Sequence, residues 1–206
     1  CELPVGAYVQ DIVGPLGTPS KIERYGTVVC AGGGIGIAAI LPILTALHKA
    51  GNKVISVLAG RTKNLIIMED DVRENSDEVI IMTDDGSYGQ KGMVTAGVEE
   101  VLKREHVDKV LAIGPPVMMK FTSLLAHKYG VPNDVSLNTI MVDGTGMCGG
   151  CRLTVGGETK FACVDGPDFD GHLVDFDEAM KRGQMYKEFE RHAYEESCNL
   201  LNKEVK

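Results

Sequence analysis

The residues with the clearest chemistry lie in one glycine-rich stretch, 143–163, which reads DGTGMCGGCRLTVGGETKFAC. Its potential metal ligands are spaced Asp143-x4-Cys148-x2-Cys151-x11-Cys163. Cysteines in a C-x4-C-x2-C spacing, with a fourth cysteine further along the chain, can hold a 2Fe–2S cluster. Here an aspartate takes the first ligand position. The intervening glycines allow a tight backbone, and their N–H groups can hydrogen-bond to cluster sulfur. The stretch therefore predicts a 2Fe–2S site.

Other interpretations of these cysteines stay open. C-x2-C is also a zinc spacing, and three cysteines with one further ligand would complete a zinc site. Cys148 and Cys151 could instead form a redox-active dithiol, or remain unligated thiols. Cys198 is a rival fourth ligand, although its predicted helical setting suits an ordinary thiol better. Cys30 lies inside a predicted strand and is expected in the core.

A second glycine-rich stretch, 30–40, reads CAGGGIGIAAI. Its spacing fits the G-x-G-x-x-[GA] pattern of dinucleotide sites, and it lies between a predicted strand and a predicted helix. Glycines there let the backbone approach a pyrophosphate, while N–H groups at the helix N-terminus face its charge. The same turn could be purely structural. The candidate nucleotide ligands in this stretch are Gly33, Gly34, Ile35 and Gly36.

Further candidate nucleotide contacts follow the later strands. Arg61 stands where an acidic residue commonly binds the ribose, and Asp84 and Asp85 come after the third strand. A carboxylate near the adenosine ribose would repel a 2′-phosphate, which favours NAD over NADP. The two aspartates could equally make only a turn. Gly114 and Pro115 end the fourth strand and would offer flat backbone to a nicotinamide.

The elements that position these loops alternate between strand and helix patterns. The predicted strands are 27–31, 53–59, 78–83 and 107–113, and the predicted helices are 37–50, 64–73, 91–104 and 117–129. Strands that are apolar along their whole length and separated by helices indicate a parallel sheet covered on both faces. Four such units predict an open, doubly wound α/β sheet with ligands at the carboxyl ends of its strands.

The pattern changes after residue 134. A fifth strand is expected at 135–142, and a hairpin is expected to join 152–155 to 159–162 across Gly156-Gly157. Residues 164–177 are expected to form an acidic loop, and 178 to about 201 an amphipathic helix.

The N-terminal segment shows a short strand pattern at 8–13, followed by a Gly/Pro-rich turn. Because a lone strand does not fold by itself, we expect that residues preceding Cys1 have been removed or are not shown. A frayed N-terminal arm is the alternative.

Composition narrows the class of protein further. The 206 residues carry a net charge of −8, which argues against a nucleic-acid partner because phosphate binding needs a basic surface. The sequence contains neither a secretory signal pattern nor an apolar run of about 18 residues, so we expect a cytoplasmic protein without a membrane span. Neither a Ser/His/Asp set nor a pair of catalytic carboxylates is evident, and no catalytic side chain is assigned.

Six motifs follow one another along the chain: GPLGTP, VVCAGGGIGIAAILPI, GRTKNL, TDDGSYGQKG, AIGPPVMMK and NTIMVDGTGMCGGCRLTVGGETKFACVDGPDFDGHLVDF. Over about residues 5–180 the chain resembles the ferredoxin–NADP reductase-like electron-transfer subunits. It is most similar to the small (alpha) subunits of NADH-dependent reduced ferredoxin:NADP oxidoreductases, also called sulfide dehydrogenase beta subunits. The related dihydroorotate dehydrogenase subunits typically carry four cysteines, whereas Asp143 replaces the first one here.

This resemblance implies a division of the chain. Residues 1–20 would be the tail of an FAD-binding β-barrel that is missing here. Residues 21–133 would form an NAD(P)-binding domain, 134–177 a small 2Fe–2S domain and 178–206 a C-terminal helix.

The resemblance also implies the ligands and the activity. The cluster ligands would be Asp143, Cys148, Cys151 and Cys163, and NAD(H) would bind at the glycine loop and at Gly114-Pro115. FAD would be held mostly by the missing domain. The chain would be an oxidoreductase subunit, incomplete alone, that passes electrons between NAD(P)H, FAD and the cluster to a larger flavin/iron–sulfur, glutamate synthase-like subunit in a hetero-oligomer. A dihydroorotate dehydrogenase subunit is the nearest alternative, and a zinc-stapled nucleotide-binding module without redox activity is the alternative of another class.

Overall fold

The computed structural model describes the backbone of residues 4–203 and the side chains of residues 4–196. The main sheet contains β1 (Thr27–Gly33), β2 (Lys53–Gly60), β3 (Glu78–Thr83), β4 (Gln90–Lys91), β5 (Lys109–Ile113), β6 (Asn133–Ser136) and β9 (Asp168–Asp170). Their order across the sheet is β4-β3-β2-β1-β5-β6-β9. Neighbouring strands pair in parallel, except that β9 runs antiparallel to β6. The expected doubly wound α/β sheet is confirmed.

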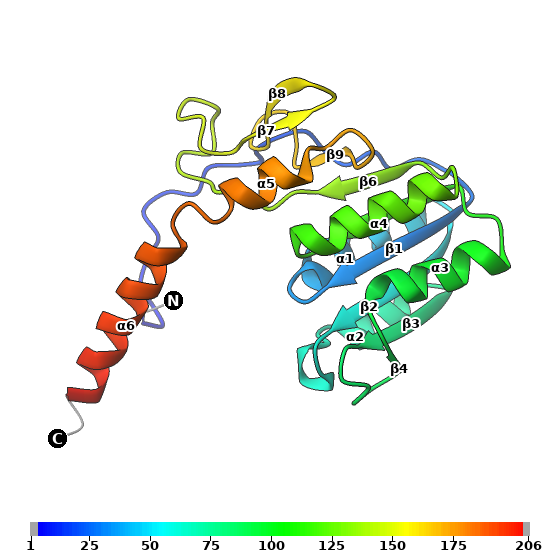
Figure 1. Cartoon of the computed structure of the whole chain (residues 1–206), viewed down its shortest axis with the longest axis horizontal. Helices are drawn as coiled ribbons and strands as arrows, with labels where there is room; N and C mark the ends of the chain where they lie inside the picture. The colour runs from blue at the N-terminus through cyan, green and yellow to red at the C-terminus, as the bar shows by residue number, and fades with distance from the viewer. Residues whose placement is uncertain (1–3, 204–206) are drawn as a thin grey trace.

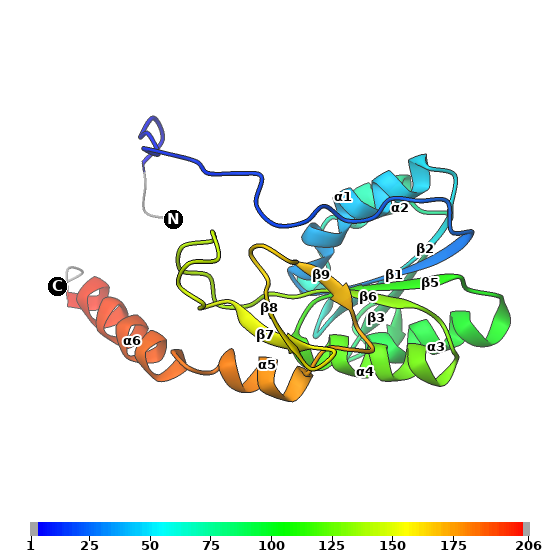
Figure 2. The same cartoon turned by 90° about the horizontal axis from the view of Figure 1, so that it is seen from above.

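Helices cover both faces of this sheet (Figures 1 and 2). On one face lie α1 (Gly36–Lys49) and the short α2 (Glu69–Glu74), which follows a 3-10 turn, η1 (Lys63–Leu65). On the other face lie α3 (Val94–Arg104) and α4 (Pro116–Lys128). The central strands are consequently apolar along their whole length, as their sequences indicated.

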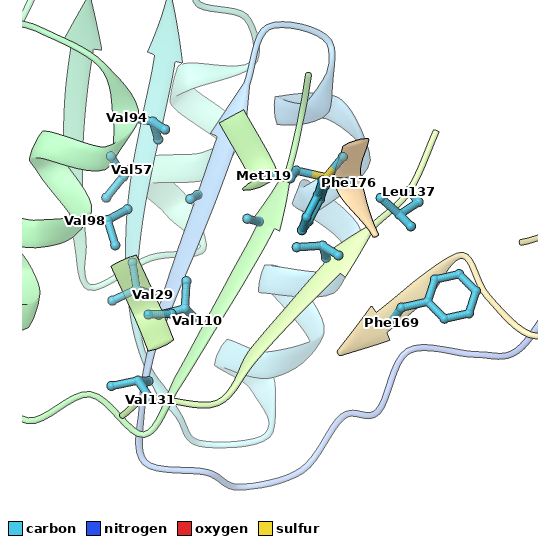
Figure 3. Close-up of a cluster of buried hydrophobic side chains, with 14 of the residues drawn as sticks. Val29, Val57, Val94, Val98, Val110, Met119, Val131, Leu137, Phe169 and Phe176 are labelled. Atoms are coloured by element: carbon cyan, nitrogen blue, oxygen red, sulfur yellow. The ribbon is translucent and has the colours of Figure 1, made fainter. Parts of the chain in front are cut away.

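Each face of the sheet has its own buried core. Because side chains alternate between faces along a strand, Val28 of β1 packs with α1 while Val29 packs with α3 and α4. Figure 3 shows the second core, in which Val29 and Val57 of the sheet lie near Val98 of α3. These side chains are almost completely shielded from solvent.

A small lobe is attached at the β6 edge of the sheet. It consists of an antiparallel hairpin, β7 (Arg152–Val155) and β8 (Glu158–Phe161), followed in the chain by β9 and α5 (Phe176–Arg182). Leu153 of the hairpin and Phe176 of α5 belong to the same buried cluster as the α3–α4 core. Figure 3 shows Phe176 beside Met119 of α4. The lobe is therefore packed against the sheet through one continuous core.

The last helix, α6 (Lys187–Lys203), projects away from the rest of the molecule (Figure 1). Its side chains from 187 to 196 are exposed. Among residues 4–203, none of the helices is both long enough and apolar enough to cross a bilayer. The thiol of Cys198, a rival metal ligand in the sequence, lies outside the described side chains.

Three expectations about the first half of the chain are wrong. Residues 8–13 form no strand: their side chains are exposed, and the segment stands clear of the sheet and its helices (Figure 2). The helix expected at 64–73 is split into η1 and α2, because Met68 adopts a left-handed conformation with φ 54° between them. The third helix begins at Val94 rather than at Lys91, because Gln90 and Lys91 form the short β4.

Three expectations about the second half are also wrong. The fifth strand ends at Ser136 rather than continuing to 142, because the chain then turns toward the lobe and Leu137 N–H bonds to Pro167 O at 2.9 Å. The acidic segment 164–177 is not all loop, since it contains β9. The helix expected from 178 is interrupted after Arg182, and α6 begins at Lys187. The β7–β8 hairpin across Gly156-Gly157 is confirmed.

Candidate functional site

The glycine turn after β1 joins the carboxyl ends of three strands. Gly34 has φ +55° and donates its N–H to Ala59 O of β2 at 2.9 Å. Gly36 begins α1, and a Cβ there would lie only 2.2 Å from Ile113 O of β5. Gly36, at the second glycine position of the pattern, is therefore needed for close packing of the helix against the sheet, a role that the third position usually has in dinucleotide turns.

A cavity of about 1000 Å³ opens beside this turn, at the carboxyl edge of the sheet. This volume lies at the upper end of the range for small-molecule and cofactor sites. Six of the sequence-predicted nucleotide residues line it: Gly33, Gly34, Ile35, Arg61, Asp84 and Pro115. Residues from four separate loops thus converge on one cavity, next to the N-terminus of a helix of 14 residues. Two N–H groups of its first turn, those of Ile37 and Ala38, bond to Gly34 O and Ile35 O.

The other three predicted residues do not line the cavity. Gly36 packs on β5, and Gly114 lies against Met118, whose Sδ would be 2.9 Å from a Cβ at that position. Asp85 accepts a hydrogen bond from Ser87 N–H at 2.9 Å within its own turn. The turn interpretation thus applies to Asp85, whereas the neighbouring Asp84 faces the cavity.

Sequence reasoning missed the helical walls of this cavity. They come from the start of α3 and from α4, and comprise Met93, Val94, Thr95, Ala96, Glu99, Val117, Met118, Phe121, Leu124, Leu125 and Lys128. Val117, Phe121 and Leu124 recur at helical spacing and are about half exposed. Periodicity alone cannot separate such a face from a core face.

The cysteine site is built at the open end of the β7–β8 hairpin. Cys151 precedes β7 and Cys163 follows β8, so the hairpin brings them together with their Sγ atoms 3.2 Å apart. Both thiols are buried, whereas Cys148 is exposed. Asp143 lies beside Cys148, and its Oδ2 accepts a hydrogen bond from Cys148 N–H at 2.7 Å. The four predicted ligands are thus grouped as two pairs.

Backbone N–H groups surround these sulfur atoms. Gly150 N–H donates to Cys148 Sγ at 3.3 Å, and the nearby Gly146 N–H acts to lower the pKa of the Cys163 thiol. Gly146 has φ +87°, and a Cβ there would lie 2.8 Å from Val164, so only glycine fits this approach. Donors aimed at sulfur suit a negatively charged cluster, whose potential they tune.

The charges at this site follow from its hydrogen bonds and burial. A hydrogen bond from Thr145 N–H to Asp143 Oδ1, at 2.6 Å, holds the pKa of this carboxyl below its usual value, and Cys148 acts in the same direction. Burial raises the pKa of the Cys163 thiol, and the adjacent Cys151 raises it further. The negative charge of Asp143 also raises the Cys163 pKa, so the carboxylate acts on the same site as the thiols.

The ligand grouping bears on the kind of metal site. Among the residues that the structure describes, no three His, Cys, Asp or Glu side chains converge on a point that could hold a single ion. A structural zinc needs four ligands around one ion. A two-iron cluster instead takes its protein ligands in pairs, two on each iron. The residues present fit the second kind of site.

Comparison with known proteins agrees with this geometry. Residues 138–175 match the family model described as the iron–sulfur cluster binding domain of dihydroorotate dehydrogenase B. The chain is 54% identical over 190 residues to a dihydroorotate dehydrogenase B (NAD(+)) electron transfer subunit homolog of Thermotoga maritima, covering 92% of this chain and 67% of that protein. The chain belongs to this family of electron-transfer subunits. A Methanopyrus kandleri protein named as a probable subunit of this kind is 37% identical over 156 residues, which cover 76% of this chain and 58% of the relative.

Solved structures place this electron-transfer subunit among ferredoxin reductase-like proteins. A structure of NADH-dependent reduced ferredoxin-NADP oxidoreductase, from a study of flavin-based electron bifurcation, matches with TM-score 0.86 and 51% identity over 94% of this chain and 70% of that chain. The C-terminal domain of a Pyrococcus furiosus hydrogenase matches with TM-score 0.52 and 25% identity, over 60% of this chain and all of that one. The chain spans 67%, 64% and 58% of three curated relatives.

Proposed function

We propose that this chain carries the pyridine-nucleotide and 2Fe–2S sites of an electron-transfer subunit. The observation that carries the proposal is the grouping of Asp143 with Cys148 and of Cys151 with Cys163, on a lobe that shares its core with the nucleotide-binding sheet. In this proposal the domains divide at 1–20, 21–133, 134–177 and 178–206.

The two pairs would ligate different irons. Cys151 and Cys163 would hold the buried iron, because their Sγ atoms already lie 3.2 Å apart. Asp143 and Cys148 would hold the exposed iron. The Asp143 carboxylate keeps lone pairs for a metal while it accepts the Thr145 and Cys148 N–H groups. Its lowered pKa keeps it ionised, as a ligand must be.

The cavity at the sheet edge would take NAD(H). Gly33, Gly34 and Ile35 would hold the pyrophosphate against the N-terminus of α1. Pro115 would form the flat surface for the nicotinamide, and the adenosine half would lie near Arg61 and Asp84. Of the remaining predicted residues, Gly36 and Gly114 would act indirectly by letting α1 and the β5 turn approach each other. Asp85 would only shape its own turn.

The chemistry would come from the cofactors. Nicotinamide, flavin and cluster together convert a two-electron hydride donor into single-electron steps. The residues of this chain bind and orient the nucleotide, exclude water around the buried thiols and supply N–H donors to sulfur. FAD would be held largely by sequence that the longer relatives have beyond the matched region.

The partner would be a larger flavin/iron–sulfur subunit of glutamate synthase-like type. The match to the ferredoxin-NADP oxidoreductase structure supports this choice. A dihydroorotate-oxidising flavoprotein is the second candidate, because several relatives carry that name. Co-purification of the complete subunit from its native cells, with mass-spectrometric identification of the partner, distinguishes the two.

The cluster claim is tested by reconstituting the full chain anaerobically with iron and sulfide. We expect iron and sulfide to bind in equal amounts, and dithionite reduction to give the EPR signal of a reduced 2Fe–2S cluster. Cys163→Ser should abolish or strongly change this signal, whereas Cys30→Ser, which alters a core thiol, should leave it intact. Zinc binding without an EPR signal would overturn the proposal in favour of a nucleotide-binding module.

A further inference from the structure

The segment Leu16–Ser20 comprises the last four residues of the GPLGTP motif and the serine that follows it, and the function proposed above gives this segment no role. It belongs to the extended N-terminal part of the chain and forms no strand. It nevertheless contacts two parts of the cysteine site. One is the Cys163 arm, residues 164–168, and the other is the loop that follows Asp143.

The arm after Cys163 is held by hydrogen bonds. Thr18 N–H donates to Gly166 O at 2.6 Å, and Thr18 Oγ1 donates to Val164 O at 3.1 Å. Ser20 Oγ donates to Asp168 Oδ2 at 2.5 Å, at the start of β9. Val164 directly follows Cys163, so these bonds hold the backbone next to a proposed ligand.

The loop after Asp143 is held by packing. Leu16 Cδ1 would lie 3.0 Å from a Cβ at Gly144, which places the leucine directly against this loop. Gly17 has φ +76°, and its own Cβ would be 2.3 Å from Gly166 O. The chain can approach the arm after Cys163 this closely only because position 17 is glycine.

We propose that Leu16–Ser20 is a positioning strap that fixes the Cys163 arm relative to the Asp143 loop. An effect of the strap on electron transfer rests on the proposed function, whereas its effect on the position of the two segments depends only on these contacts. Any movement of the N-terminal part of the chain would then be transmitted to the ligands of the cluster site.

Thiol accessibility tests the strap without a cluster. In the metal-free full chain, kept reduced, alkylation of buried Cys163 requires local opening, whereas exposed Cys148 serves as an internal reference. We expect Gly17→Ala and Thr18→Val to speed Cys163 alkylation by about five-fold or more relative to Cys148, since each removes or strains a contact. Thr18→Ser keeps the hydroxyl and should restore the slow rate.

Two matched variants control for general effects. Gly130→Ala introduces a similar positive-φ strain, at φ +68°, without any close contact and far from the site. Thr159→Val repeats the threonine substitution on the exposed face of β8. Both should leave Cys163 alkylation unchanged. If Gly130→Ala accelerates it as much as Gly17→Ala does, global destabilisation explains the effect and the strap is refuted.

A second readout uses the iron-loaded chain. Gly17→Ala and Thr18→Val should shift the midpoint potential and the EPR g-values, and Thr18→Ser should return both to the original values. Faster alkylation in a chain that binds no iron would support the strap while overturning the proposed function. Normal alkylation, potential and g-values in Gly17→Ala and Thr18→Val would overturn the strap alone.

Discussion

At the scale of single residues, Asp84 and Asp85 are neighbours with different surroundings. Asp84 lines the cavity at the sheet edge. Asp85 is held by hydrogen bonds from the Ser87 hydroxyl and N–H, which keep the pKa of its carboxyl below the usual value. Only one of the two carboxylates is therefore directed to where a bound nucleotide would lie.

This difference predicts the selectivity between NADH and NADPH. Asp84→Asn should strengthen NADPH binding about five- to ten-fold, because it removes a negative charge that repels the 2′-phosphate. The effect is modest because water screens the repulsion between these two charges. Asp85→Asn, the matched control, should leave both affinities unchanged. Fluorescence titration of the full chain with each nucleotide measures the dissociation constants, and equal effects of the two substitutions would contradict the assignment.

Cys30 is a second residue whose surroundings change its acidity. It is completely buried in the core under α1, as expected, and burial raises the pKa of its thiol from 9.0 to about 12. The unfolded chain therefore releases a proton from this thiol at lower pH than the folded chain does.

The raised pKa of Cys30 makes the free energy of unfolding depend on pH. Above pH 9 unfolding becomes more favourable, and stability from this group is lost as the pH rises toward 12. Urea titrations of the original chain and of Cys30→Ala should show that their difference in unfolding free energy shrinks by about 1.4 kcal/mol per pH unit above 9. A difference that stays constant up to pH 10.5 would show that the thiol ionises normally.

At the scale of elements, α1 contains a proline in its interior and α4 has one at its start. Pro42 lies in the middle of α1, where it removes an intrahelical hydrogen bond, and its ring is exposed. Pro116 is the first residue of α4, where a backbone N–H would lack an intrahelical partner in any case.

The two positions predict opposite effects of the same substitution. Pro42→Ala should raise the free energy of unfolding by about 1–3 kcal/mol, because alanine restores the hydrogen bond and removes the ring. Pro116→Ala should lower it by up to about 1 kcal/mol through the greater freedom of the unfolded chain. Urea unfolding measures the free energy of unfolding of both variants. If Pro42→Ala is no more stable than Pro116→Ala, α1 needs its proline.

At the scale of the whole molecule, the sequence predicts the buried layers better than the surfaces. β1, β2, β3 and β5 were predictable because strands covered on both faces are continuous apolar runs. β9 was not, because its sequence, Asp168-Phe169-Asp170, buries one side chain between two carboxylates. Three residues are too few for an alternating pattern to emerge.

The candidate site was also predictable only in part. Spacing predicted that Asp143 and the three cysteines belong together, since they share one loop and one hairpin. It could not predict that Asp143 also binds two N–H groups of its own loop, because hydrogen-bond partners depend on the path of the backbone. The α3–α4 wall of the cavity was also missed, because half-exposed helix faces resemble core faces in sequence.

The exposed helix α6 predicts that stability is unevenly distributed over the chain. Ending the chain at Gly183 removes α6, whose side chains from 187 to 196 are exposed, and should change the free energy of unfolding by less than about 0.5 kcal/mol. Ending it at Val174 also removes α5 and its buried Phe176, and should cost about 3–5 kcal/mol. Urea unfolding compares them, and a large loss from the shorter truncation would show that α6 packs on the body.

The two edges of the main sheet govern how chains can meet one another. β4 is only two residues long, Gln90 and Lys91, and β9 is three residues long with an aspartate at each end. Short, charged edge strands are poor templates for another chain's backbone. Copies of this molecule should therefore resist joining into continuous β-linked fibres at high concentration, and any lasting association should be made by loops and helices.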